Sequence, residues 1–445
     1  MRWLWALVMV AAPVEAQEFT TLKGHGGPVM AIAVSGAGQV ATASFDNSVG
    51  LWDGRVPKWL DGHAAAVNAV VFVASEGGAD QADQAAQAVV SAGDDFSVRL
   101  WREATSQVLG RHRGKVTSLA VQPGGMWVAS GSWDGTIKMW PLDAGEAYDL
   151  AAPGAGVNAL AFSQGGKVLY AATTGGQVLR YDMTQPEAAP LPLVRHGFGV
   201  NRLVVGEGWL AYGAVDGVTR VIEAESGKPV ADFTLERRPV LAMAYHRETA
   251  QIAVGDGQGY IMMLGVGMGA GSEAGGWRIT RDFRATRRGP VWALAFSRDG
   301  EMIWAGGLDD VAYGWPVETL DKFGATMGQE RTFLRDADKM PNGERQFMRK
   351  CSICHALEKG PSRKAGPSLF QVFGRRAGTV AGYAYSPVLD GSDIIWNDAS
   401  IDALFDQGPD HYIPGSKMPM QVIAGAGDRA DLIAFLKEAT KRDTP

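Results

Sequence analysis

A pattern of apolar and polar positions recurs about every forty residues between Glu18 and about Val317. Each unit starts with a small polar turn and continues with an apolar strand and a strand rich in Gly, Ser and Ala. A turn that often holds Asp follows, and a last strand closes on a large residue. The seven closing positions are Trp52, Trp101, Trp140, Tyr181, Ile222, Leu264 and Trp315. This period is typical of four-stranded blades, so residues 17–317 are predicted to form an all-β, seven-bladed propeller.

The repeats resemble the WD-repeat family. Gly24-His25 and Gly62-His63 match the family's Gly-His pair, and Trp52-Asp53 is a literal Trp-Asp pair. The family's turn Asp, six residues before the closing Trp, is matched by Asp46, Asp95, Asp134 and Asp309. Blades four to six depart from the pattern, with Gly175 in place of the turn Asp and with Ile222 and Leu264 in place of Trp.

This resemblance has two structural implications. The histidines at the blade-opening turns are expected to hydrogen-bond within their own blades; they are His25, His63, His112 and His196. The segment from Phe19 to Lys23 is expected to supply the outer strand of the last blade, so that the ring closes without an open sheet edge.

Two blades carry insertions, at residues 76–87 and 265–276. By propeller strand order both loops leave the face opposite the Gly-His turns, and the chain exits after Trp315 from that same face. We therefore expect the C-terminal domain to lie over the face with the two insertions. The alternative is that both loops are tolerated surface insertions without a role.

The N-terminus has the pattern of a secretory signal. Arg2 precedes an apolar run from Trp3 to Ala12, and small residues around Val14-Glu15-Ala16 precede an expected cut at Gln17. The alternative is an uncleaved anchor helix, although the run is short for a membrane span. No later stretch approaches about 18 uninterrupted apolar residues, so we expect an exported, soluble, periplasmic protein without a membrane span.

Charge separates the C-terminal part into two regions. The formal net charge of -6 argues against nucleic acid as a partner. Between residues 349 and 376, Glu358 is the only acidic residue among seven basic ones, which we call the basic segment: Arg349, Lys350, Lys359, Arg363, Lys364, Arg375 and Arg376. Six Asp residues then follow between 390 and 410. The basic segment is suited to steering a redox partner with an acidic docking surface.

The only two cysteines lie in the sequence Cys351-Ser352-Ile353-Cys354-His355. This C-x-x-C-H spacing allows two thiols on one helical turn to add to the haem vinyl groups, while the adjacent imidazole reaches the iron. A zinc half-site is the alternative, but zinc needs two more soft or imidazole ligands, and His411 alone is nearby. The sequence therefore predicts one covalent haem c.

From Asn342 onward the chain resembles the class I cytochromes c of mitochondria and photosynthetic bacteria. Gly343 and Phe347 match the first helix of that family, which crosses a last helix, here expected over Asp428–Thr440. The segment Tyr412–Met418 matches the family's ligand loop, which implies Met418 as the second iron ligand, with Met420 as a near competitor. The family's small all-α fold is accordingly expected for residues 341–445, after a linker at 318–340.

The same resemblance implies further cofactor contacts. Pro367 is expected to accept a hydrogen bond from the His355 imidazole. The haem propionates are expected to bind four side chains: Arg375, Tyr385, Trp396 and Ser416. The chain departs from the family near the exposed haem edge, where Phe405 stands for a Tyr and Pro419-Met420 for an aliphatic-aromatic pair.

These features favour an exported electron carrier, because an iron bound by both His355 and Met418 has no position left for substrate. In the propeller, four of the five histidines are assigned to blade turns and only His246 is spare, so the propeller is interpreted as a protein-docking platform. One alternative is an oxidoreductase whose substrate site lies in the propeller and whose cytochrome relays electrons. Another is a non-catalytic scaffold or redox sensor.

Overall fold

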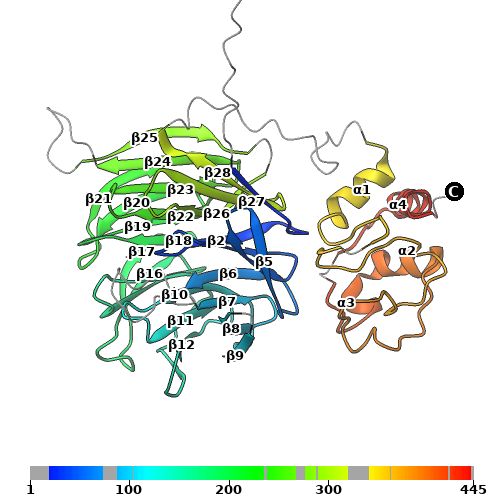
Figure 1. Ribbon diagram of the computed structural model, residues 1–445, viewed down its shortest axis with the longest axis horizontal. Helices are drawn as coiled ribbons and strands as arrows, with labels where there is room; N and C mark the ends of the chain where they lie inside the picture. Colours follow the sequence, from blue (N-terminus) through cyan, green and yellow to red (C-terminus); the bar gives the residue numbers. More distant parts are fainter. Residues whose placement is uncertain are drawn as a thin grey trace, which may run out of the picture.

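A computed structural model describes residues 20–73, 88–103, 105–234, 238–266, 276–286, 289–318, 340–360, 362–418 and 421–441. The predicted signal at 1–16, nearly all of the predicted linker and most of both insertions lie outside these residues. Within them the chain forms a large all-β part and a smaller helical part beside it (Figure 1). We call the latter the helical domain.

The β part consists of seven four-stranded antiparallel sheets. The strands of the first four sheets are β2 (Val29–Val34), β3 (Val40–Ser44), β4 (Ser48–Asp53), β5 (Val56–Asp61); β6 (Val67–Phe72), β7 (Val89–Gly93), β8 (Ser97–Arg102), β9 (Thr105–Arg111); β10 (Val116–Val121), β11 (Trp127–Ser132), β12 (Ile137–Pro141), β13 (Tyr148–Asp149); and β14 (Val157–Phe162), β15 (Val168–Thr173), β16 (Gln177–Asp182), β17 (Leu191–Arg195). The last three comprise β18 (Val200–Val205), β19 (Trp209–Ala214), β20 (Val218–Glu223), β21 (Pro229–Thr234); β22 (Val240–His246), β23 (Gln251–Asp256), β24 (Tyr260–Val266), β25 (Trp277–Arg284); and β26 (Val291–Phe296), β27 (Met302–Gly307), β28 (Val311–Pro316), β1 (Thr20–Lys23). The predicted seven-bladed propeller is confirmed.

The ring is closed by the first strand. β1 pairs antiparallel with β28, with Thr20 opposite Gly314 and Lys23 opposite Val311. This pairing confirms the expectation that the N-terminal segment completes the last blade. It also removes the open edge that β28 would otherwise present to other chains.

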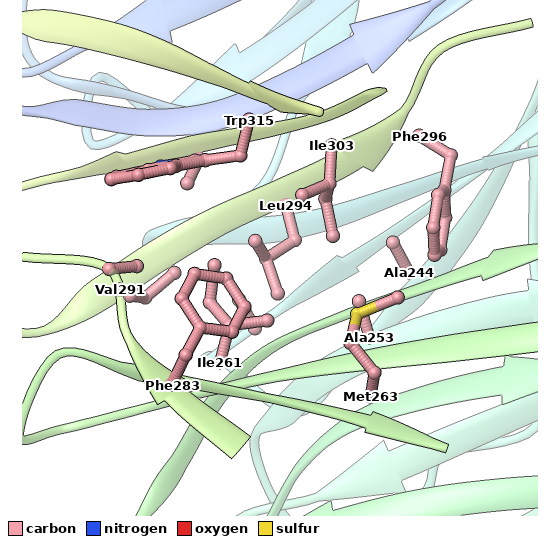
Figure 2. Close-up of a cluster of buried hydrophobic side chains, with 13 residues drawn as sticks. Ala244, Ala253, Ile261, Met263, Phe283, Val291, Leu294, Phe296, Ile303 and Trp315 are labelled. Atoms are coloured by element: carbon pink, nitrogen blue, oxygen red, sulfur yellow. The ribbon is translucent and has the colours of Figure 1, made fainter. Parts of the chain in front are cut away.

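All seven closing residues lie on the third strand of their blade and are buried. Figure 2 shows one of them: Trp315 of the last blade lies in one apolar cluster with Val291 of its own blade and with Phe283 and Ile261 of blade six. Burial of a side chain of this size contributes about 1.5–3 kcal/mol relative to an exposed position. The apolar positions of the repeat therefore form the contacts that hold neighbouring blades together.

The blade-opening histidines form hydrogen bonds within their own blades, as the family resemblance implied. His25 Nδ1 lies 3.0 Å from Asp46 Oδ2 and His25 Nε2 lies 2.7 Å from Thr42 Oγ1, which also accepts from Trp52 Nε1 at 2.8 Å. His63 forms the equivalent network with Asp95 and Ser91. His112 bonds Thr136 and Ser130, and His196 bonds Asp216. Each network ties a turn at one face of the propeller to the blade interior.

The helical domain is built from α1 (Asn342–Lys350), α2 (Asp398–Gln407), α3 (Pro409–Tyr412) and α4 (Ala426–Ala439). α1 and α4 cross closely, as Figure 1 shows. A Cβ at Gly343 would lie 2.1 Å from the backbone oxygen of Asp431, so this crossing requires glycine. Phe347 packs against Phe435 with ring centroids 5.5 Å apart, which confirms the predicted contact of the first and last helices. Of the helices in the described residues, none has the length and apolar character needed to cross a membrane.

The helical domain contacts the face of the propeller that carries the Gly-His turns. Arg363 pairs with Asp61 at the end of β5, and the backbone of Arg363 and Lys364 lies against Gly26. The expectation that this domain covers the opposite face, where the insertions begin, was wrong. The chain does leave β28 at that opposite face, but about twenty further residues can span up to about 70 Å, so the exit point does not determine where the domain lies.

Candidate haem site in the helical domain

The C-x-x-C-H segment continues the turn at the end of α1. The Cys351 N–H donates to Phe347 O at 2.8 Å, and the N–H groups of Cys354 and His355 donate to Cys351 O at 3.0 and 2.8 Å. This compact turn places both thiols and the imidazole on the wall of a single cavity. The C-x-x-C-H spacing of the sequence therefore brings Cys351, Cys354 and His355 together in space.

Both cysteine side chains are held largely away from solvent. Burial raises the pKa of Cys351 to about 12, and the nearby Cys354 adds to the rise. Burial also raises the pKa of Cys354. This rise in pKa applies to the polypeptide before haem is attached, and no disulfide competes for either sulfur atom.

His355 is oriented by a single backbone acceptor. Its Nδ1 donates to Pro367 O at 2.8 Å, because a carbonyl oxygen can only accept. Burial lowers the pKa of the imidazole, so it is neutral and its Nε2 keeps a free lone pair, as a metal ligand requires. A Cβ at Gly366 would lie 2.5 Å from His355 Cε1, so glycine is needed for the Pro367 loop to approach the ring.

Met418 lines the same cavity as His355, from the loop that follows α3. Gly415 in this loop has φ of 84°, a left-handed conformation that glycine adopts without strain. Lys417 donates from Nζ to Ala384 O at 2.9 Å and so ties the loop to the neighbouring segment. Met420, the competing candidate, lies outside the described residues.

All four side chains predicted to bind propionates line this cavity: Arg375, Tyr385, Trp396 and Ser416. Arg375 already donates to the carbonyl oxygens of Phe370 and Ser368, which fixes its guanidinium and leaves three of its five N–H donors. The Tyr385 hydroxyl oxygen accepts from the Val380 N–H at 3.3 Å, so its own proton remains available to donate. Ser416 Oγ is buried and has no hydrogen-bond partner within the described polypeptide.

Sequence reasoning missed several residues of the cavity wall. Ser386 has a buried Oγ without a partner in the described residues, like Ser416. Tyr383 packs its ring 4.7 Å from that of Tyr385, and its hydroxyl donates to Ala365 O. The Tyr-Ala-Tyr spacing at 383–385 was the available signal for Tyr383, whereas nothing in the pattern marks Ser386.

The residues present fit a haem. The other walls are mostly apolar, with Leu369, Val372 and Leu404 among them, and suit a flat hydrophobic ring. Buried hydroxyls without partners fit ionised propionates, which must be hydrogen-bonded when buried. The zinc alternative finds no support, because nowhere in the described ranges do three His, Cys, Asp or Glu side chains gather as a metal cluster.

Comparison with known proteins agrees with both domains. Residues 16–53 and 104–141 match the family described as WD domain, G-beta repeat, and residues 341–440 match the cytochrome c family. Cytochrome c of Sesamum indicum is 44% identical over 101 residues, which cover 22% of this chain and 88% of the relative. Cytochrome c of Gossypium barbadense is 43% identical over 100 residues (22% and 87%), and that of Gibberella zeae 43% over 101 residues (22% and 92%).

These similarities and the cavity together settle the nature of the C-terminal part. It carries covalently bound haem c and transfers electrons, and the WD-repeat propeller is a platform for docking. The chain belongs to the cytochrome c family through its helical domain, which is fused to an N-terminal seven-bladed WD-repeat propeller.

Proposed function

We propose that the protein is an exported, soluble, periplasmic electron carrier with a single haem c bound by His355 and Met418. The observation that carries this proposal is that both side chains line one cavity together with both cysteines. When bound, the haem supplies a one-electron couple, and two protein ligands leave its iron closed to substrate. The chain's own residues orient the imidazole, exclude water with apolar walls and offer hydroxyls to the propionates.

The contacts of the propeller histidines favour a carrier over an enzyme with a substrate site in the propeller. His246 was the spare imidazole, and in the structure it bonds Thr249 Oγ1 at 2.9 Å and Arg298 O at 3.0 Å. The other four bind within their blades. We therefore assign the propeller to protein docking and propose redox proteins with an acidic docking surface as the partners.

Substitution of Met418 tests the closed, six-coordinate carrier. In the full-length holoprotein, Met418→Ala should abolish the weak sulfur-to-iron absorption band in the red and open the iron to cyanide or imidazole. Met420→Ala is the matched control and should keep the band. Survival of the band in Met418→Ala would show that another residue is the ligand.

Export, haem content and partners require separate measurements. Mass spectrometry of the protein from a periplasmic fraction should show cleavage before Gln17 and one covalent haem per chain. Proteins captured by the intact propeller fusion should then exchange electrons with it in stopped-flow experiments, at rates that fall with salt. Absence of electron exchange with any captured partner would contradict the carrier proposal.

A further inference from the structure

The propeller forms one wall of the haem cavity. Besides the residues of the helical domain, the cavity is lined by Phe45 and Asn47 from the turn between β3 and β4, by Ala64–Ala66 from the loop between β5 and β6, and by Asp94 at the end of β7. These turns belong to blades one and two and lie on the Gly-His face. We call this part of the propeller the covering face.

The domains meet most closely at Gly26 of the covering face. A Cβ at this position would lie 2.3 Å from the carbonyl carbon of Arg363 and 2.5 Å from the nitrogen of Lys364. Both neighbours are backbone atoms, which cannot move aside by a change of rotamer. Glycine is therefore required at position 26 because any side chain there would clash with the backbone of the helical domain.

Charge and ring contacts next to Gly26 join the two domains. Arg363 places its guanidinium carbon 4.1 Å from the ring centroid of Trp59 and pairs with Asp61 at 2.5 Å. Both partners lie on β5, the outer strand of blade one, at the side of the propeller nearest the helical domain in Figure 1. The basic segment, expected to steer an acidic partner, thus already contacts a carboxylate of the same chain.

These contacts are weak enough for the two domains to separate. The side chains of Arg363 and Asp61 are 33% and 66% exposed, and exposed ion pairs are weak and salt-sensitive. Interfaces inside one chain permit relative domain motion unless they are large and hydrophobic.

We propose that the covering face is the resting, intramolecular partner of the haem domain and that a redox protein docks at the haem cavity only after the two domains separate. This inference rests on the proposed carrier function. It gives the propeller a regulatory role in addition to docking. If the covering face must move away from the haem cavity, electron exchange depends on any partner that binds or displaces the propeller.

Two variants of the full-length holoprotein test whether the covering face restricts access to the haem cavity. Gly26→Ala should force the domains apart, whereas Gly36→Ala is the matched control, since a Cβ there has nothing within 4 Å and the residue lies in the turn between β2 and β3 on the other face. Asp61→Lys should repel Arg363, and the charge swap with Arg363→Asp should restore the ion pair but not the contact of Arg363 with Trp59.

The first measurement reports domain separation without any redox reaction. Hydrogen exchange of the backbone at 62–66 and 362–366 should be about fivefold faster in Asp61→Lys, the factor expected for one exposed ion pair. Gly26→Ala should show at least the same increase, together with a larger radius of gyration by small-angle scattering. Gly36→Ala should match the wild type, and the charge swap should lie closer to the wild type than Asp61→Lys does.

The second measurement uses an electrode with a carboxylate-terminated monolayer as an acidic surface too large to enter between the domains. Electron exchange with it should be several-fold faster in Gly26→Ala than in Gly36→Ala. Equal electron-exchange rates and equal hydrogen exchange in these variants would contradict the proposed role of the covering face and leave the carrier function intact. Hydrogen exchange that shows opening, but no electron exchange by any variant, would contradict the carrier function instead.

Discussion

The histidine networks of the propeller blades and the buried hydroxyls of the haem cavity differ in where their hydrogen-bond partners come from. In blade one, Thr42 Oγ1 contacts both His25 and Trp52, and Asp46 accepts from the backbone of Gly26 and Ser48. At the cavity, the hydroxyls of Ser386 and Ser416 are buried without a partner in the described polypeptide. The difference teaches that the histidine networks at the blade-opening turns are completed by residues of the same blade, whereas the buried hydroxyls of the cavity are completed by the cofactor.

The strongest test of this contrast is removal of the cofactor. In the Cys351→Ala/Cys354→Ala double variant the haem is no longer covalent and can be extracted. After extraction, the helical domain should lose its cooperative unfolding transition and its helical circular dichroism, because an empty apolar cavity destabilises the core around it. The unfolding transition of the propeller should remain.

Calorimetry and circular dichroism of the extracted protein measure both transitions. Lys359→Ala, an exposed change in the same segment, is the control and should keep both. If the helical domain still unfolds cooperatively without haem, its polypeptide is self-sufficient and the contrast between the two regions fails.

A smaller effect is expected from pH on the propeller. Burial lowers the pKa of His112 from its usual 6.5 to about 4, so this imidazole is neutral in the folded state. Between these pH values the unfolded chain binds the proton that the folded chain excludes. The contribution of His112 to the free energy of unfolding is therefore fully present above pH 6.5. It falls by up to about 3 kcal/mol as the pH approaches 4.

Denaturant unfolding of the propeller across this pH window measures the effect. His112→Gln, which does not titrate, should be less stable at neutral pH and show a flatter pH profile. An unchanged pH profile in this variant would show that His112 is not the group responsible.

The smallest expected effects come from single hydroxyls. Ser130 Oγ lies 2.7 Å from both Trp140 Nε1 and His112 Nε2, so Ser130→Ala should destabilise the propeller by about 1–3 kcal/mol by leaving buried groups unpaired. Ser416→Ala leaves no donor or acceptor of the described polypeptide unpaired. It should lower stability by about 1 kcal/mol or less, and only when haem is bound.

Comparison of holoprotein and haem-extracted protein separates the two serines. The effect of Ser130→Ala should be the same in both, whereas that of Ser416→Ala should disappear on extraction. A loss at Ser416 that persists without haem would mean that its hydroxyl has a partner in the polypeptide.

Much of the fold could be predicted because it repeats. A closing residue recurs in each unit, and a turn Asp and an opening His recur in several of them, so the units support one another; the seven blades and the contribution of β1 were predicted correctly. The crossing of the first and last helices followed from Gly343 and Phe347, although α4 begins at Ala426, two residues before the expected start. The haem segment could be found because C-x-x-C-H places all its chemistry within one turn.

The placement of the helical domain could not be predicted. It depends on a few contacts between residues far apart in the chain, Gly26 with Arg363 and Asp61 with Arg363, and such contacts leave no periodic trace. Ser386 was missed for a related reason. Nothing in the sequence distinguishes it from other serines, and its role depends on the cavity that surrounds its hydroxyl in the fold.

The pairing of β1 with β28 also has a consequence for how the protein matures. Thr20 faces Gly314, so the first strand to emerge during synthesis finds its partner only after nearly three hundred more residues have followed. Such a non-local contact forms late, because loop-closure entropy opposes it until the intervening blades are in place. Any truncation before Pro316 therefore leaves β1 without its full partner strand, and an unpaired strand favours association with other chains.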